Sequence, residues 1–346
     1  MTPFSRAFYA PAKLVWRTGR LALPVVLCLN GCQSPWAYAA EPAPSRAVTR
    51  PMATATPAPG ANGAIASLEL IIRTARSEYY TLTYWSDGLR VKGFLGRPTE
   101  GTALPAIIFN RGGHGEFGEL WGQQLIPFVE AGFVAVGSQY RGACGSEGLD
   151  EFGGADVDDV LNLIPLLKLL PYVDPERIGM MGGSRGGMMT YLALKQESLS
   201  ATHDIKAAVT VGGMADVTRT LWESPGMMVV LSALIGKGPN EAPEAYRDRS
   251  AVFWPDLVNA PLLILHGEGD ESLPVEQSQQ LAELLAEAGK TVKLITFPHD
   301  DHGLSAHHAG YPEALAWFQQ YLGKPGEDHS FQTHEQAMRE VSKAWP

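Results

Sequence analysis

The chain has 346 residues, of which 45% are hydrophobic and 18% are charged, and its 27 Lys and Arg against 37 Asp and Glu give a formal net charge of −10. This length and composition fit one well-packed globular domain of about 250 residues with extensions. The acidic balance argues against a nucleic-acid partner, because binding to phosphates needs a basic footprint.

The first 39 residues predict an export signal and its processing region. Residues 1–31 carry four basic residues and no acid, so their removal would leave 23 basic against 37 acidic residues, a net charge of −14. The apolar run at 21–29 is too short and too interrupted by proline to span a membrane. We therefore expect an exported protein that is periplasmic or lipid-anchored to the cell envelope.

Two processing sites remain open in this region. Cys32 ends a lipobox-like LNGC sequence and would become the lipid-bearing first residue of the mature chain, which would attach it to a membrane. The alternative is cleavage after residues 37–39 (AYA), which resemble an ordinary A-x-A site. An uncleaved anchor is the third alternative.

Residues 40–64 are rich in Ala, Pro, Thr and Gly, so they predict a disordered tether before a folded catalytic domain at 65–325. The domain should open with a β-hairpin over 79–95. Apolar strand candidates then follow at 105–109, 133–137, 177–181, 206–211, 261–265 and 292–297.

The alternation of these strands with helices predicts an α/β fold with a mostly parallel, doubly wound sheet. One helix should cover 156–170, with a kink at Pro165. Residues 214–255 interrupt the alternation and are apolar, which predicts a small cap insert over the site or, alternatively, a segment that only packs onto the domain. The charged residues 326–346 are expected to form a C-terminal tail or a short surface helix.

The most informative motif is G-x-S-x-G at 182–186, between the strand candidate at 177–181 and a helix candidate at 188–195. A serine hydroxyl is a weak nucleophile at its own pKa, so it must be exposed, oriented and served by a base. A sharp strand-to-helix turn exposes the side chain, and the flanking glycines leave space for that turn. The motif predicts a nucleophile elbow at Ser184, with an incidental serine in a glycine-rich loop as the alternative.

Two later strand candidates lead to residues that would complete a catalytic triad. The strand at 261–265 is followed by Asp270, and the strand at 292–297 is followed by His302. Parallel strands end at one edge of a sheet, where α/β folds place their sites, so we expect both side chains to meet Ser184. The order Ser, Asp, His along the chain is that of α/β-hydrolases.

Neighbouring residues leave alternatives open for two of these roles. Glu268 is the alternative acid and His299 is the alternative base. His307 and His308 are expected at the surface, and His266 is expected to form hydrogen bonds in the turn at the end of its strand.

The oxyanion hole should combine two backbone donors. One is the N–H of Arg185, the residue after the nucleophile. The second should come from the loop at 110–115 (NRGGHG), from Arg111 or Gly112, although a merely flexible glycine loop is the alternative. His114 is expected to pack within this loop.

Cysteine usage and metal motifs add little chemistry. After processing, Cys144 would be the only cysteine of the folded domain, so no disulfide can form within it, and we expect a buried or half-buried loop thiol. The chain has no C-x-x-C or H-E-x-x-H pattern, so neither a metal nor a cofactor is expected.

Four motifs together resemble the catalytic domain of the prolyl oligopeptidase family of serine peptidases. They lie at 140–148 (YRGACGSEG), 152–160 (FGGADVDDV), 182–187 (GGSRGG) and 266–274 (HGEGDESLP), within roughly 80–325. The resemblance implies an α/β-hydrolase fold, serine peptidase activity and a triad acid in the last motif, at Asp270.

The sequence departs from the full-length peptidases of that family in one respect. Only about forty residues of low-complexity sequence separate the predicted export signal from the domain, so we expect no β-propeller here. The resemblance therefore does not carry dipeptidyl-peptidase specificity over to this chain, and esterases also use the same catalytic domain without a propeller.

The sequence as a whole predicts an exported serine hydrolase that cleaves peptide or amide bonds through an acyl-enzyme. Ser184 would attack, His302 would transfer the proton, and Asp270 would orient the imidazole. A carboxylesterase acting on small apolar acyl esters is the alternative, because the same groups hydrolyse esters. A non-catalytic binding protein on this fold is disfavoured by the intact Ser, Asp and His.

Overall fold

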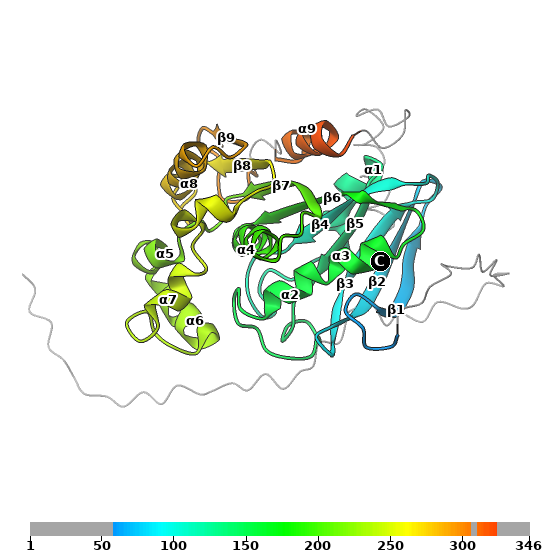
Figure 1. Cartoon of the computed structure of the whole chain (residues 1–346), viewed down its shortest axis with the longest axis horizontal. Coiled ribbons are helices and arrows are strands. Elements are labelled where there is room, and N and C mark those ends of the chain that lie inside the picture. The colour runs from blue at the N-terminus through cyan, green and yellow to red at the C-terminus, as the bar shows by residue number, and fades with distance from the viewer. Residues whose placement is uncertain (1–57, 306–309, 324–346) are drawn as a thin grey trace, which may run out of the picture. The chain divides into compact units, whose positions relative to one another are not determined.

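The computed structural model describes residues 58–305 and 310–323. Within them, nine strands form one sheet in the order β1-β2-β3-β5-β4-β6-β7-β8-β9 (Figure 1). Their bounds are Ile65–Arg73 (β1), Ser77–Ser86 (β2), Leu89–Pro98 (β3), Leu104–Asn110 (β4), Val134–Ser138 (β5), Val173–Gly183 (β6), Ile205–Val211 (β7), Leu262–Gly267 (β8) and Val292–Phe297 (β9). The predicted export signal, Cys32, residues 40–57 of the tether and the tail at 326–346 lie outside the described residues.

The sheet has an antiparallel edge and a parallel body. Strands β1 to β3 pair antiparallel with one another, and β3 pairs antiparallel with β5. From β5 through β4, β6, β7 and β8 to β9, every pairing is parallel. The predicted mostly parallel sheet is therefore confirmed, and the carboxyl ends of its parallel strands share one edge.

Helices cover both faces of the sheet, as the strand at its centre requires. Successive side chains of a strand point to opposite faces, and every residue of β4 is buried. Ala106 and Ile108 belong to one apolar cluster, whereas Ile107 and Phe109 belong to the other. The first cluster includes residues of α2 (Asp156–Leu161), α3 (Leu163–Lys168), α4 (Arg185–Ser200) and α8 (Glu276–Glu287), and the second includes residues of α1 (Ile126–Glu130) and α9 (Gly310–Leu322).

The kink predicted at Pro165 is a complete break. The expected helix at 156–170 consists of α2 and α3, which are separated at Asn162. Proline has no N–H to donate to the carbonyl of Leu161, four residues earlier, and its ring crowds that carbonyl. The interruption therefore falls one turn before the proline.

The N-terminal edge differs from the sequence-based expectation. The last residues predicted to be tether are instead bound to β2, because Gly63 N–H donates to Trp85 O at 2.9 Å and Trp85 N–H donates to Ala64 O at 2.9 Å. Strand β1 then adds an edge that the sequence pattern did not reveal. Its burial lacks the alternation of a half-buried strand, and it is held by backbone pairing with β2 together with the packing of Ile65, Leu68 and Ile72 on the core.

Residues between β7 and β8 form a helical insert. It contains α5 (Val217–Glu223), α6 (Pro225–Ile235) and α7 (Pro243–Arg247). In Figure 1 these three helices lie together, beyond the carboxyl ends of the parallel strands. In the described part of the chain, no helix is both long enough and apolar enough to cross a membrane.

Candidate active site

The turn between β6 and α4 places Ser184 in a conformation that few residues adopt. Its φ of 55° and ψ of −124° lie outside the usual regions for a side chain with a Cβ. The backbone around it is fixed, because Ser184 N–H donates to Val211 O at 2.9 Å and its carbonyl accepts from Met214 N–H at 3.2 Å. The structure therefore holds the half-buried serine on a sharp strand-to-helix turn.

The two glycines of the motif are required by close backbone contacts. A Cβ on Gly182 would lie 2.1 Å from Gly186 O, and a Cβ on Gly186 would lie 2.0 Å from Asn110 O. Both distances are far below van der Waals contact. This packing brings the end of β4 against the first turn of α4, beside Ser184.

Asp270 follows β8 and is held by four hydrogen bonds. Its Oδ1 accepts from the N–H groups of Ser272 and Leu273 at 2.8 and 2.9 Å. Its Oδ2 lies 2.6 Å from His302 Nδ1 and 3.1 Å from His266 Nε2. The side chain is fully buried, which alone would raise its pKa, but the hydrogen bonds from both histidines and Leu273 hold the pKa well below its usual range.

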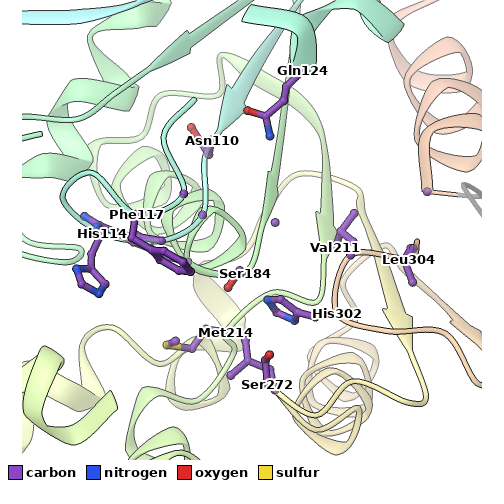
Figure 2. Close-up of a pocket in the computed structure, with 18 of the residues that line it drawn as sticks. Asn110, His114, Phe117, Gln124, Ser184, Val211, Met214, Ser272, His302 and Leu304 are labelled. Atoms are coloured by element: carbon purple, nitrogen blue, oxygen red, sulfur yellow. Dashed lines mark hydrogen bonds between the residues drawn. The ribbon is translucent and has the colours of Figure 1, made fainter. Parts of the chain in front are cut away.

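His302 follows β9 and connects Asp270 to the open side of the site. Its side chain is 30% exposed, and it borders the same cavity as Ser184 (Figure 2). Gly212 makes this approach possible, because a Cβ there would lie 3.1 Å from His302 Nδ1 and 3.2 Å from Asp270 Oδ2. The structure therefore brings Ser184, Asp270 and His302 to one edge of the sheet.

The cavity in front of Ser184 has a volume of about 790 Å³. Most of its wall is apolar. The apolar side chains come from the sheet, from the loops after β4, β5, β8 and β9, from the insert and from the start of α9: Phe109, Phe117, Phe152, Met181, Val211, Met214, Met227, Leu273, Leu304 and Tyr311. A cavity of this size and lining accepts a small, largely apolar ligand portion.

The candidates for the oxyanion hole occupy different places. Gly112 and Arg185 border the cavity, and a Cβ on Gly112 would lie 3.4 Å from Ser184 Cβ. Arg111 lies behind them, with its carbonyl accepting from Tyr140 Oη at 2.9 Å. Of the two candidates from the loop, Gly112 therefore has the better position, and the assignment of N–H donors remains a prediction.

The side chain of Arg111 organises the loop that presents Gly112. The guanidinium is fully buried and donates to four backbone carbonyls of this loop as well as to Gln139 O. The acceptors in the loop are Gly112, Gly115, Phe117 and Gly118, at 2.9–3.2 Å. Hydrogen bonds from one buried cation therefore fix the conformation of this loop.

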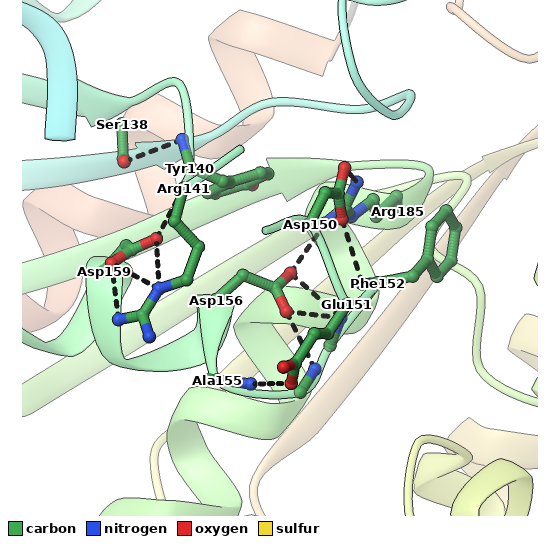
Figure 3. A network of polar contacts seen from close by, with 12 residues as sticks. Ser138, Tyr140, Arg141, Asp150, Glu151, Phe152, Ala155, Asp156, Asp159 and Arg185 are labelled. Atoms are coloured by element: carbon green, nitrogen blue, oxygen red, sulfur yellow. Dashed lines mark hydrogen bonds and ion pairs between the residues drawn. The ribbon is translucent and has the colours of Figure 1, made fainter. Parts of the chain in front are cut away.

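The side chain of Arg185 ties the nucleophile turn to two buried carboxylates (Figure 3). Its guanidinium binds both oxygens of Asp150, at 2.6 and 2.8 Å, and Asp156 Oδ2 at 2.6 Å. It also lies 5.0 Å from the ring centroid of Tyr140 and 4.5 Å from that of Phe152. Burial raises the pKa of Asp150, but the hydrogen bonds and positive charge of Arg185 outweigh burial and lower it overall.

This buried network was not predicted from the sequence. Asp150 also accepts from Gly115 N–H at 3.1 Å, so it joins the Arg111 loop to α4. Asp156 accepts from the N–H groups of Gly153 and Gly154, which fixes the start of α2. The available signal was the motif at 152–160, which resembled the family without indicating a partner 29 residues away.

The alternative triad residues lie away from the site. Glu268 is exposed and accepts from Thr296 Oγ1 at 2.7 Å, and His299 is exposed. His114 borders the cavity from the loop (Figure 2), whereas His307 and His308 lie outside the described residues. The geometry therefore favours Asp270 and His302 over these alternatives.

Cys144 is a half-buried loop thiol without a catalytic partner in the described structure. Burial, a hydrogen bond to Glu116 and the nearby negative charges raise the pKa of its thiol to about 12, so it is uncharged at neutral pH. Across residues 58–305 and 310–323, no group of three or more His, Cys, Asp and Glu side chains is placed to hold a metal ion.

The insert contributes to the cavity, as its apolar composition suggested. Met214, Ser224 and Met227 form part of the wall. Trp222 and Val229 face away from it and are 80% and 73% exposed. The insert therefore supplies one side of the cavity while much of its apolar surface stays open.

The order of the strands, with a serine at the turn after β6 and the acid and histidine after β8 and β9, defines an α/β-hydrolase. The sequence profile of the prolyl oligopeptidase family matches residues 119–325, more than half of the chain. The chain belongs to this family of serine-type peptidases.

Individual relatives agree with this membership. The uncharacterized peptidase YtmA of Bacillus subtilis is 34% identical over 224 residues, which cover 64% of this chain and 85% of YtmA. The acylamino-acid-releasing enzyme of Rattus norvegicus is 26% identical over 65% of this chain and 32% of its own length. The acylaminoacyl peptidase of Pyrococcus horikoshii superposes with a TM-score of 0.63 and 29% identity, over 76% of this chain and 45% of that structure. The chain thus spans most of YtmA but less than half of the two larger enzymes.

Proposed function

We propose that this chain is an exported serine peptidase that cleaves peptide or amide bonds through an acyl-enzyme intermediate. The observation that carries the proposal is the 2.6 Å contact between His302 Nδ1 and Asp270 Oδ2, with His302 and Ser184 bordering one cavity. Family membership and the peptidase relatives support the same reaction.

The proposed reaction uses these groups in two stages. Ser184 Oγ attacks the carbonyl carbon while His302 Nε2 takes its proton, and the C–N bond then breaks as His302 protonates the leaving amine. Water next attacks the acyl ester, again giving a proton to His302, and the acid leaves with Ser184 restored. Asp270 stabilises the imidazolium in both stages, and the N–H groups of Arg185 and Gly112 stabilise the oxyanion.

The cavity favours an apolar group next to the scissile bond. A small neutral peptide or acyl-amino amide fits its mainly apolar wall. The same wall fits the acyl group of a small ester, so a carboxylesterase is the second candidate. Amide hydrolysis distinguishes the two, because only the peptidase must protonate a poor amine leaving group.

The test is hydrolysis of matched substrates by the purified full chain. One set contains apolar amino-acyl and peptidyl anilides, and the other contains p-nitrophenyl esters of the same acyl groups. We expect turnover of both sets, with all of it lost in Ser184→Ala. Ester cleavage without amide cleavage would assign the chain to the esterases, and activity that survives in Ser184→Ala would reject the triad.

Export is a separate part of the proposal and has its own test. The N-terminal sequence supports a signal with lipidation at Cys32 or cleavage after Ala39. Expression in a bacterium, followed by mass measurement of the mature protein, should show a lipid-modified N-terminus that Cys32→Ser abolishes. A mature chain that begins at Ala40 in both proteins would instead show ordinary cleavage.

A further inference from the structure

His266 ends strand β8, four residues before Asp270, and is completely buried. Its Nε2 lies 2.8 Å from Leu273 O and 3.1 Å from Asp270 Oδ2. Its Nδ1 lies 2.7 Å from Ser278 Oγ, in the first turn of α8. Both ring nitrogens therefore have polar partners, and one of these partners is the proposed triad acid.

The chemistry of the partners assigns the proton on this ring. A backbone carbonyl can only accept, so Nε2 must carry the hydrogen that Leu273 O and Asp270 Oδ2 share. The Ser278 hydroxyl can donate to Nδ1 or accept from it, so this contact does not restrict the hydrogen on Nε2.

His266 and His302 contact the same carboxylate oxygen of Asp270. Asp270 Oδ2 is also the atom that receives His302 Nδ1–H, whereas Oδ1 is held by two backbone N–H groups of the following turn. His266 thus adds a second contact to Oδ2 at 3.1 Å and draws negative charge away from the oxygen that faces His302. The two histidines are the titratable side chains in contact with Asp270. His114, Glu119, Arg185 and Glu271 border the same cavity as His302, and the backbone carbonyl of the buried Asp300 accepts from Gly269 N–H at 2.8 Å.

We propose that His266 is a positioning residue, which fixes Asp270 toward His302 and sets how readily His302 accepts the proton of Ser184. This inference rests on the proposed hydrolase activity. It adds a fourth side chain to Ser184, Asp270 and His302, one that touches neither substrate nor reacting atoms.

Removal of the His266 hydrogen bond has two expected consequences. More negative charge remains on Asp270 Oδ2, so the His302 imidazolium is stabilised and the acidic limb of the pH profile moves to higher pH. The carboxylate also loses one of the two contacts on Oδ2, so its alignment with His302 is less well fixed and kcat falls, by about tenfold for a lost hydrogen bond to a charged group. KM should stay unchanged, because His266 does not line the cavity.

Two conservative substitutions separate these effects from simple packing. In His266→Gln, the side-chain amide can occupy the place of Nε2 and donate to Asp270, so near-normal kinetics are expected. In His266→Asn, the amide reaches only the place of Nδ1 and the donor to Asp270 is lost. His203→Asn, at an exposed position, is the matched control.

The measurement is the pH dependence of kcat and kcat/KM for p-nitrophenyl acetate with the full chain, together with the melting temperature of each variant. We expect the raised acidic limb and the lower kcat in His266→Asn only. Equal losses in both His266 variants, with an unmoved acidic limb, would reduce His266 to a packing residue and overturn the proposal. Loss of activity in these variants while Ser184→Ala stays active would instead overturn the proposed function.

If His266→Asn does not fold, a second measurement tests whether His266 donates a hydrogen bond to Asp270. Nitrogen-15 NMR of the histidines in the wild-type protein reports which ring nitrogen carries the hydrogen. The proposal requires His266 to keep a hydrogen on Nε2 over the pH range in which the enzyme is active. A hydrogen on Nδ1 with Nε2 bare would exclude the donor to Asp270.

Discussion

Helices α4 and α6 both begin at the cavity, yet they differ in how many of their residues are buried. In α4, which starts directly after Ser184, eleven of sixteen residues are buried, whereas in α6, which starts after Ser224, only Leu231 is buried. Ion pairs of Arg185 fix the start of α4, whereas Ser224 and Met227 at the start of α6 border the cavity.

This difference in burial suggests a division of roles, in which the α4 side holds the proposed catalytic groups and the α6 side contacts the substrate. Catalytic groups must be held to a fraction of an ångström, which buried hydrogen bonds and close packing achieve. A flexible methionine on a largely exposed helix adapts to different apolar groups. Substitutions near α4 and Asp270 should therefore abolish activity or stability, and those on α6 should change preference.

The largest expected effect is on Asp270, the acid of the proposed triad. Asp270→Asn keeps the size of the side chain but lets the amide favour the wrong tautomer of His302, so kcat should fall about 10⁴-fold with little change in KM. Steady-state kinetics on the best anilide or ester will measure this. Glu268→Gln is the matched control, and an equal loss there would move the acid to Glu268.

The next effect concerns stability on the α4 side. Arg185→Met would leave Asp150 and Asp156 buried without their cation, which should lower the free energy of unfolding by about 3–5 kcal/mol. Urea unfolding followed by circular dichroism will measure the loss. Arg90→Met removes an exposed ion pair with Glu147 and should change little. Equal losses in the two variants would contradict the contrast drawn here.

Acidic pH should destabilise the α4 side of the cavity, because it protonates Asp150, the partner of Arg185. The pKa of Asp150 is lower in the folded than in the unfolded protein, so its ionised form stabilises the fold above the unfolded value of about 3.9. That stabilisation is lost as the pH falls through the lowered folded pKa. Unfolding midpoints at neutral and acidic pH should therefore converge for the wild type and Asp150→Asn. A difference that does not shrink in acid would refute this electrostatic role.

The smallest effects are expected on α6. Met227→Ala removes an apolar contact from the cavity wall. For bulky apolar substrates that reach this contact, kcat/KM should fall by an amount that corresponds to about 1–3 kcal/mol of transition-state stabilisation, and small substrates should be less affected. Val229→Ala, on the exposed side of the same helix, should leave kinetics unchanged and stability within about 0.5 kcal/mol. Equal changes in preference for both variants would show that α6 acts through its own folding rather than through the cavity.

The predictable features of the site were those encoded in local backbone geometry. A strand, a glycine-flanked serine and a helix specify the turn at Ser184 within about fifteen residues, and parallel strands necessarily bring Asp270 and His302 to the same edge. The parallel order of the strands also followed from their alternation with helices.

The features that escaped prediction depend on contacts between distant residues. Asp150 and Arg185 are 35 residues apart, and neither has a local pattern that names its partner. Strand β1 was missed because its apolar residues do not alternate along the chain, and its pairing with β2 is a contact between separate segments. Likewise, His266 was expected only to form hydrogen bonds in a turn, since its contact with Asp270 requires the fold of the whole turn.

The position of α6 in the chain also bears on how this hydrolase can diversify. The helix lies in the connection between β7 and β8, whose parallel pairing runs from Ala208 and Leu262 to Val211 and Leu265. That pairing sets the register of the strand that leads to Asp270. Leu231 of α6 is fully buried, Met227 borders the cavity and Val229 is exposed, so a changed sequence in this helix would have to keep an apolar residue at 231 while position 227 alone could reshape the cavity wall.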